Sequence, residues 1–184
     1  FPITFEENVN WNPDDKSGLL WKFYSTDDII EGSSDGGSLQ AWTFDSDDQI
    51  RLHTGSSNYV EAGNGNDYIQ NWSWHANGIY TGGPGNDRFS VANGFIYGGT
   101  GADTFQIVPI YTDVNGINGP GVGEGDQVYV YVMDFEVGVD NVVGSGLPIS
   151  YQVGSEGIYL RAENANYSML IKDVFDVNQL NLTT

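Results

Sequence analysis

Three nine-residue segments of the chain superimpose without a gap and share the pattern G-G-x-G-x-D-x-hydrophobic-x. They are Ala62–Gln70, Gly82–Ser90 and Gly98–Gln106, the first with Ala in place of the leading Gly. The glycines permit positive φ and close backbone approach, so that six residues bend with their carbonyl groups turned inward. The Asp offers a formal charge to a hard cation, and the apolar residue after it points from a very short strand into a narrow core. The repeats therefore predict a calcium-filled coil of short strands.

The Asp of the repeat recurs at a nearly constant interval. Asp28 and Asp48 precede an apolar residue in the same way, and with them the intervals between successive Asp residues are 20, 19, 20 and 16 residues. Two nonapeptides would make one turn of about eighteen residues, so that each turn supplies one Asp. We therefore expect these Asp residues to stack in a single row on one edge of the coil.

The half-turns between the repeats carry no second row of Asp. Their inward apolar positions are expected at Val60, Tyr80 and Ile96. Their metal positions hold Asn58, Gly78 and Gly94. The pattern therefore predicts that calcium fills one edge only, and that the opposite edge is free of metal.

The nonapeptides resemble those of the repeats-in-toxin (RTX) family of secreted bacterial proteins. That resemblance implies an all-β chain whose repeats form a right-handed parallel β-roll loaded with calcium. A second segment, Asp126–Val142, resembles the D-x-I…D-F-x-x-G-x-D-x-I segment that follows the last repeat in secreted metalloproteases and alginate epimerase modules. An ordinary β-sandwich with turns rich in Gly and Asn is the structural alternative.

The expected organisation has three parts. An N-terminal cap over residues 1–25 would close the sheet edge, the calcium-binding β-roll would cover 26–106, and an antiparallel C-terminal β cap with a secretion signal would cover 107–184. Within the last part, Gln127–Met133 alternates like a strand. A closing hairpin is expected from Ile158–Arg161 and Tyr167–Ile171.

Two calcium sites have the full support of the motif, and both lie between neighbouring glycine loops. Each would take carboxylates and backbone carbonyls from two turns to reach six or more oxygen ligands. The residues expected to form them are Asp67, Asp87, Asp103, Gly63, Gly65, Gly83, Gly85, Gly99, Gly101, Asn64, Asn66 and Asn86. A third site would involve Asp45, Asp47 and Asp48, and weaker candidates are Asp28 and Asp126. Folding should then be coupled to metal binding.

The charge of the chain excludes several partners. Acidic residues number 25 against 6 basic ones, for a net charge of −19, which argues against binding to nucleic acid or to anionic membranes. An aromatic content of 14% argues against a disordered chain. The absence of Cys excludes disulfides and thiolate zinc sites, and no apolar run is long enough for membrane insertion.

The expected location is outside the cell. No basic-then-apolar leader precedes the first repeats, and the chain begins at Phe1 without Met, as a processed product or a fragment would. The RTX resemblance implies export by a type I route that reads an uncleaved C-terminal signal. Leu180–Leu182 suits such a signal, although the acidic-aliphatic ending of the protease branch is lacking.

No catalytic constellation is found, so we expect a protein that is not an enzyme. His53 and His75 are the only histidines, and there is no H-E-x-x-H motif, no G-x-S-x-G elbow and no phosphate-binding loop. Neighbouring carboxylates are plentiful in so acidic a chain, and therefore do not single out a glycosidase site.

Two roles remain for such a module. It is expected to serve as a structural, surface-assembly or adhesive unit that mates with like subunits. Alternatively, it is a polysaccharide-binding module of a secreted enzyme, with Trp72, Trp74 and His75 on the metal-free edge stacking on sugar rings. The same aromatic side chains would otherwise pack against the caps.

Overall fold

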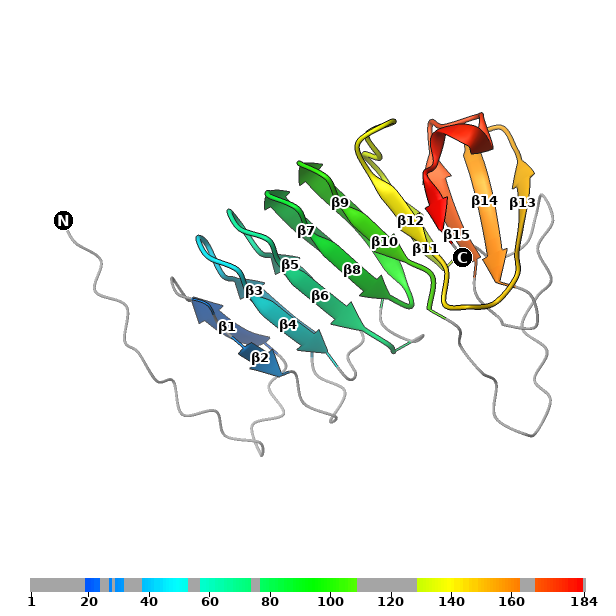
Figure 1. Ribbon diagram of the computed structural model, residues 1–184. Helices are drawn as coiled ribbons and strands as arrows, with labels where there is room; N and C mark the ends of the chain where they lie inside the picture. Colours follow the sequence, from blue (N-terminus) through cyan, green and yellow to red (C-terminus); the bar gives the residue numbers. More distant parts are fainter. Residues whose placement is uncertain are drawn as a thin grey trace, which may run out of the picture.

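The computed structural model describes residues 19–23, 27, 29–31, 38–52, 57–73, 77–108, 129–162 and 168–183. Within these ranges the regular structure is almost entirely β, with one short 3-10 helix at Val177–Gln179. The strands form two sheets, and they stack side by side from β1 and β2 at one end of the molecule to β13 at the other (Figure 1). The all-β prediction is confirmed.

Among the described residues, the larger sheet has nine strands, in the order β1-β3-β5-β7-β9-β11-β15-β14-β13. The pairs from β1 to β15 are parallel, and the last two pairs are antiparallel. Its strands are β1 (Leu19–Phe23), β3 (Ser38–Trp42), β5 (Tyr59–Glu61), β7 (Gly78–Pro84), β9 (Gly94–Thr100), β11 (Val130–Val132), β13 (Ile149–Val153), β14 (Gly157–Ala162) and β15 (Ser168–Lys172).

In the part of the chain that the structure describes, the smaller sheet has seven strands, all paired in parallel, in the order β16-β12-β10-β8-β6-β4-β2. They are β2 (Ile29–Glu31), β4 (Gln49–Leu52), β6 (Tyr68–Asn71), β8 (Arg88–Val91), β10 (Thr104–Gln106), β12 (Asn141–Val143) and β16 (Leu182–Thr183). From β1 to β12, consecutive strands therefore lie alternately in the two sheets.

The core is built from the inward residues of the strands, because side chains alternate between the two faces of a strand, and one such residue from most strands joins a continuous row in each sheet. In the larger sheet the buried, mutually paired residues are Ala41, Val60, Tyr80, Ile96, Val132, Ile171 and Ile158. In the smaller sheet they are Ile30, Ile50, Ile69, Phe89, Phe105 and Val142. The inward positions predicted for the half-turns are confirmed. Burying one large side chain of this kind stabilises the fold by about 1.5–3 kcal/mol.

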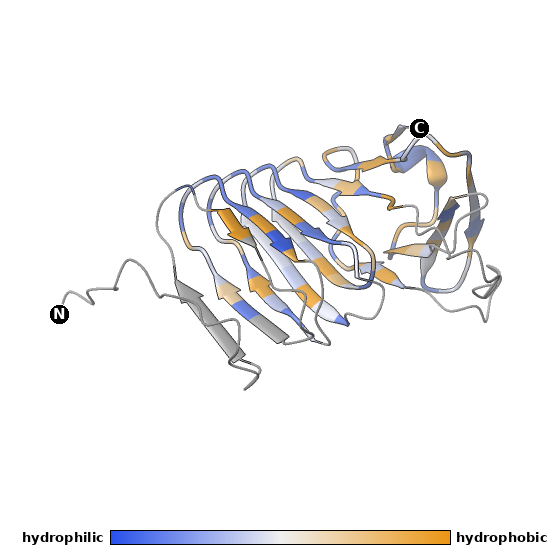
Figure 2. Cartoon of the chain, turned by 90° about the horizontal axis from the view of Figure 1, so that it is seen from below, coloured by the Kyte–Doolittle hydropathy of each residue, from blue (hydrophilic) through white to orange (hydrophobic). Residues whose placement is uncertain are grey.

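The alternation is visible as apolar and hydrophilic segments that follow one another along the strands, whereas the row of loops joining the sheets is mostly hydrophilic (Figure 2). Phe89 and Phe105 stack in the core with ring centroids 5.4 Å apart, and Phe135 lies 5.9 Å from Phe105. Apolar packing therefore continues past the last repeat into the C-terminal part of the chain.

The predicted closing hairpin is confirmed, since β14 and β15 pair antiparallel with Ile158 opposite Ile171. The antiparallel region is limited to β13, β14 and β15. Strands β11, β12 and β16 continue the parallel sheets instead, and Leu180, just before β16, is buried. The described C-terminal part therefore extends the parallel arrangement and then continues the larger sheet with antiparallel strands.

The predicted N-terminal cap is described only in part. Residues 19–23 form β1, which pairs in parallel with β3 and so adds a strand to the larger sheet. Residues 1–18, and residues 109–128 of the predicted C-terminal cap, lie outside the described residues. In the described part of the chain, no helix is long and apolar enough to cross a membrane.

Candidate metal centre

Four Asp side chains form one row along the loops that lead from the larger sheet into the smaller one. Oδ1 of Asp67 accepts a hydrogen bond of 2.8 Å from the backbone N–H of Asp48. Asp87 accepts from Asp67, and Asp103 from Asp87, at the same distance of 2.8 Å. Because each carboxylate binds the backbone of the preceding turn, the row is fixed by the stacking of the turns. The one-row arrangement expected from the Asp interval is present.

The row ends at Asp140, which was not among the predicted metal ligands. Oδ1 of Asp140 accepts from the backbone N–H of Asp103 at 3.0 Å, and its Oδ2 accepts from that of Glu136 at 2.7 Å. Nearby, the Asp134 carboxylate accepts from the backbone N–H groups of Gly98 and Gly99, at 2.8 and 3.1 Å. The two Asp residues of the D-F-x-x-G-x-D segment therefore terminate the loops of the last repeat. The D-F-x-x-G-x-D motif is the sequence signal from which these two Asp residues could have been predicted.

The second carboxylate oxygen is the unusual feature of the row. Oδ2 of Asp67, Asp87 and Asp103 is buried and has no hydrogen-bond partner among the described residues. All three side chains are at most 1% exposed. An ionised carboxylate is expensive to bury unless its oxygens are paired with donors or coordinate a metal. These three oxygens therefore require a proton or a cation.

The electrostatics of the row support the same conclusion. Burial raises the pKa of Asp67 and of Asp103 to about 6, and that of Asp87 to about 8. Backbone hydrogen bonds oppose this rise, whereas the neighbouring carboxylates add to it. Burial likewise raises the pKa of Asp140. At neutral pH the central carboxyl of the row would stay protonated unless a cation replaces its proton.

The glycine loops bring carbonyl oxygens into close register. At Gly83 (φ +117°) a β-carbon would lie 2.2 Å from the carbonyl oxygen of Gly63, and at Gly85 (φ +153°) it would lie 1.5 Å from that of Gly65. Only glycine permits both this conformation and this approach. The carbonyl groups of one loop therefore face the backbone of the next, beside the Asp row.

The loop between β3 and β4 follows the same backbone path as the glycine loops, but without glycine. Phe44 (φ 67°) and Ser46 (φ 118°) adopt the positive φ angles that Gly63 and Gly65 adopt one turn later. Holding a non-glycine residue in such a conformation costs on the order of 1–3 kcal/mol. Of the acids predicted for a third site, Asp48 belongs to the row, whereas Asp45 and Asp47 are exposed.

The Asn residues of the repeats form a second, exposed ladder. Oδ1 of Asn66 accepts from the backbone N–H of Asn86 at 3.0 Å, and Oδ1 of Asn86 accepts from that of Ala102 at 2.8 Å. Asn64 donates from Nδ2 to Oδ1 of Asp45. The side chains of these predicted ligands thus join neighbouring turns on the outer surface of the loops.

The opposite edge is filled by a neutral network. Nδ2 of Asn71 donates to the Tyr80 hydroxyl at 2.7 Å, and both side chains are buried. A β-carbon at Gly78 would lie 2.4 Å from this hydroxyl oxygen, and one at Gly94 would lie 2.8 Å from the Tyr80 ring. The Tyr80 ring therefore takes up the space beside the two glycines. Every buried carboxylate in the described ranges lies in the row on the other edge.

The aromatic residues predicted for a sugar site are only partly described. Trp72 is 59% exposed, and its Nε1 donates to Ser90 Oγ at 3.0 Å. Four candidate residues lie outside the described residues, namely Asp28, Trp74, His75 and Asp126. Their predicted roles stay predictions.

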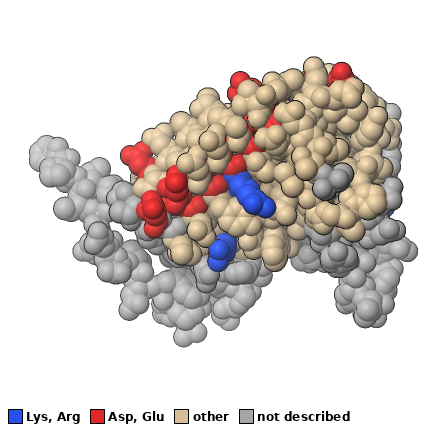
Figure 3. Space-filling model, viewed as in Figure 1, with Lys and Arg blue, Asp and Glu red and all other residues tan. Residues whose placement is uncertain are grey.

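The row differs from a site built of converging side chains. Among the residues that the structure describes, no three His, Cys, Asp or Glu side chains converge on one point. Each turn supplies a single Asp, so a cation held here would draw most of its ligands from backbone carbonyl oxygens. Acidic side chains gather in a band across one face of the molecule, with few basic side chains near them (Figure 3).

Comparison with known proteins adds no identification. A scan against protein-family models found no match, and a search of curated proteins also found none. The likeness to RTX proteins therefore rests on the repeat motifs of this chain alone.

Proposed function

We propose that this chain is a secreted calcium-binding β-roll module of the RTX type, with a structural or assembly role and no enzymatic activity. One observation carries the proposal. Three buried carboxylate oxygens, Oδ2 of Asp67, Asp87 and Asp103, are aligned in one row and lack a hydrogen-bond partner among the described residues. A row of cations would neutralise them.

The available donors favour calcium over other metals. Carboxylate and carbonyl oxygens suit hard cations, and calcium accepts six to eight of them in flexible geometry, whereas magnesium demands a near-ideal octahedron and keeps several waters. The residues that would hold the ions are Asp67, Asp87 and Asp103, together with the carbonyls of Gly63, Gly65, Gly83 and Gly85. Bound calcium would supply the positive charge that the row lacks.

The β-roll is supported by the path of the chain. Strands β1 to β12 fall alternately in two sheets, and each strand from β1 to β10 pairs in parallel with the strand two positions later. The nonapeptide repeats supply one strand and one glycine loop each. A coil with two strands per turn accounts for both features.

Coupling between folding and calcium supports secretion. The metal ligands come from different turns, so a preformed site does not exist in the unfolded chain. A chain of this kind stays unfolded where calcium is scarce and folds where it is abundant. This behaviour suits export in an unfolded state, as the RTX resemblance implies.

A role in assembly is favoured by the last strand of the larger sheet. Strand β13 pairs only with β14 in the described structure, and its sequence, Ile-Ser-Tyr-Gln-Val, contains neither charge nor proline. Tyr151 is 54% exposed and Val153 is 47% exposed. Edge strands of monomeric proteins are usually protected by charges, bulges or proline. The unprotected edge is suited to pairing with a like subunit.

Polysaccharide binding is the second candidate function. It is favoured by the exposure of Trp72, whose indole ring presents most of its surface to solvent while Nε1 is held by Ser90. Exposed, fixed aromatic rings are suited to stacking on sugars.

Circular dichroism with and without a chelator tests the proposed calcium dependence. We expect the β signal of the protein to disappear on exhaustive chelation and to return on addition of calcium, but not of magnesium. A spectrum that is unchanged by chelation would contradict the proposal.

A further inference from the structure

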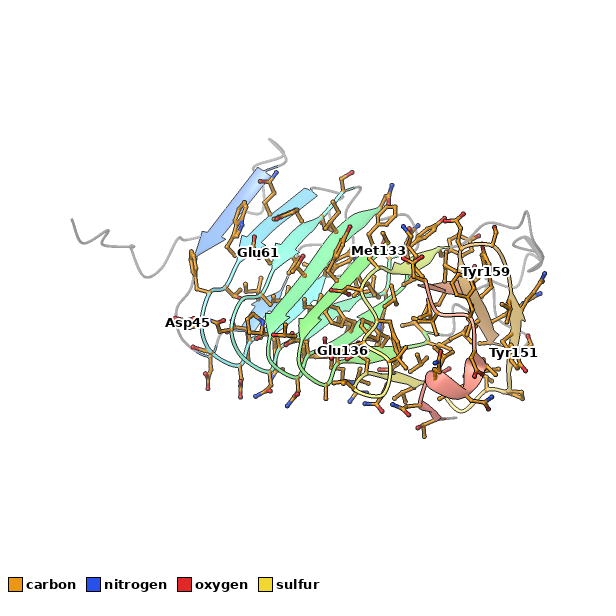
Figure 4. The ribbon with its side chains drawn as sticks, turned by 90° about the horizontal axis from the view of Figure 1, so that it is seen from above. Asp45, Glu61, Met133, Glu136, Tyr151 and Tyr159 are labelled. Atoms are coloured by element: carbon orange, nitrogen blue, oxygen red, sulfur yellow. The ribbon has the colours of Figure 1, made fainter. Side chains whose placement is uncertain are left out.

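A shallow pocket of about 330 Å³ opens where strands β3, β5 and β7 of the larger sheet run into the glycine loops. Its walls combine aromatic and polar side chains, which are Trp42, Phe44, Asp45, Glu61, Asn64 and Thr81. Glu61 lies on the sheet and Asp45 lies in the neighbouring loop (Figure 4). The buried Asp carboxylates of the proposed calcium row do not line it, whereas Gly63 and Gly83, whose carbonyl oxygens are proposed calcium ligands, do.

The Glu61 carboxylate is held in a fixed orientation. Its Oε2 atom accepts from Trp42 Nε1 at 3.1 Å and from the Tyr59 hydroxyl at 3.3 Å. The rings of Trp42 and Tyr59 lie 5.6 Å apart with planes tilted by 47°. The desolvation of Tyr59, with the charge of Glu61, raises the pKa of Tyr59. The pocket therefore presents an oriented carboxylate beside an aromatic wall before any ligand binds.

Phe44 provides an independent indication that this pocket has a function. The equivalent position of the three repeats is glycine, yet here an aromatic residue is held at φ 67° and is 43% exposed. Strained residues of this kind persist mostly at binding and catalytic sites.

From this lining we infer that the pocket binds an uncharged pyranose of a polysaccharide or glycan. Aromatic faces pack against the C–H face of a sugar ring, while carboxylate, amide and hydroxyl groups pair with its hydroxyls. Asp45 and Glu61 disfavour uronates and sulfated sugars, because these negatively charged side chains repel anionic sugars. The net charge of −19 on the whole chain adds to this repulsion. The ligand therefore differs in charge from alginate.

The surface beside the pocket suits an extended chain of sugars. Trp42 continues in register through Glu61 and Thr81 to Tyr97, across strands β3, β5, β7 and β9. A parallel line on the same face ends in Phe95 and Tyr131, whose rings stack at 4.9 Å. An oligosaccharide seated in the pocket would run across the strands over these side chains. We therefore expect oligosaccharides to bind more tightly than single sugars.

This inference gives the second candidate function a specific site, and it rests on the pocket rather than on calcium binding. Isothermal titration of the calcium-loaded protein with four probes tests it. The probes are cellohexaose and mannohexaose as neutral glycans, hexamannuronate as an anionic glycan, and hexalysine as a cationic peptide. We expect at least one neutral hexaose to bind, and hexamannuronate not to bind.

Variants locate the binding. We expect Trp42→Ala and Glu61→Gln each to weaken binding of the neutral hexaose by about tenfold or more, and Tyr151→Ala, an exposed aromatic on β13, to leave it unchanged. Circular dichroism of each variant separates a lost contact from a lost fold. Binding of hexalysine alone, binding of no probe, or equal binding to Trp42→Ala would overturn the inference, and none of these results bears on calcium.

Discussion

Oδ1 of Asp87 accepts a hydrogen bond of 2.8 Å from the backbone N–H of Asp67, while Oδ2 of the same carboxylate is buried without a hydrogen-bond partner in the described structure. One oxygen therefore joins neighbouring turns, and the other is the atom through which we propose that the row binds a cation. The same division holds for Asp67 and Asp103, which makes the row a repeated structural unit.

Replacing Asp87 by Asn separates these two roles, because Asn keeps the Oδ1 acceptor and removes the charge. With calcium, we expect Asp87→Asn to lower the free energy of unfolding by roughly 3 kcal/mol, since a ligand shared by two proposed sites is lost. With a chelator at about pH 8 or above, the variant should keep more of its β signal than the parent, whose Asp87 carboxyl has a pKa of about 8 and would be buried as a charge. Urea denaturation with calcium and circular dichroism with the chelator measure the two effects.

The control for this variant is Asp173→Asn, at an exposed residue outside the row that already adopts positive φ, a conformation that Asn tolerates. Its stability should change little in either condition. If Asp87→Asn destabilises the protein equally with and without calcium, the row does not bind the ion.

The metal-free protein should become less stable as the pH rises. The pKa values of Asp67, Asp87 and Asp103 are raised by burial to about 6, about 8 and about 6, so the folded state holds more protons than the unfolded state between their ordinary value near 3.8 and these values. Stability from these protons is fully present below about pH 4 and is lost as the pH rises towards about 8.

With saturating calcium, stability should instead rise with pH. Calcium competes with protons for the same carboxylate oxygens, and it binds more tightly as these protons are released. The β signal in circular dichroism with chelator and the urea midpoint with calcium, each measured at about pH 5 and about pH 8, test the two signs. The same direction of change with pH in the two conditions would argue against a cation in the row.

Gly85→Ala should prevent the loops from stacking. A β-carbon at this position would lie 1.5 Å from the carbonyl oxygen of Gly65, so neighbouring turns must separate, and we expect a loss of more than about 3 kcal/mol. The matched control is Gly138→Ala, which has φ +83° but no atom within 4 Å of the added carbon. There we expect only the conformational cost of about 1 kcal/mol. Equal effects would contradict the close register of the loops.

Tyr80→Phe tests the metal-free edge. The change removes the hydroxyl that accepts from Asn71 and leaves a buried amide donor unpaired, at a cost of about 1–3 kcal/mol. No carboxylate is involved. The decrease in the stability of Tyr80→Phe relative to the parent, measured by thermal unfolding, should therefore be the same at low and at saturating calcium. A loss seen only with calcium would place a metal on this edge too.

Val153→Lys tests assembly through β13. A charge on this exposed edge should reduce light scattering by the calcium-loaded protein while changing its stability by less than about 0.5 kcal/mol. Val139→Lys, in an exposed turn, serves as the control. Scattering that is absent from the parent protein, or unchanged by Val153→Lys, would argue against pairing at this edge.

The sequence by itself determined the local conformations of this protein. Its glycine and Asp intervals predicted loops with positive φ, an Asp row, and inward positions at Val60, Tyr80 and Ile96, because each follows from backbone sterics and from the two-residue period of a strand. The hairpin of β14 and β15 was visible for the same reason.

Only the tertiary structure decided which distant groups meet. Asp140 closes the row by accepting from Asp103, 37 residues earlier, and Asp134 reaches Gly98 across 36 residues. The Tyr80 hydroxyl meets Asn71, and Trp42 meets Glu61 on the next strand of its sheet. Each of these contacts depends on how successive turns are set against one another, which the glycine and Asp pattern does not specify.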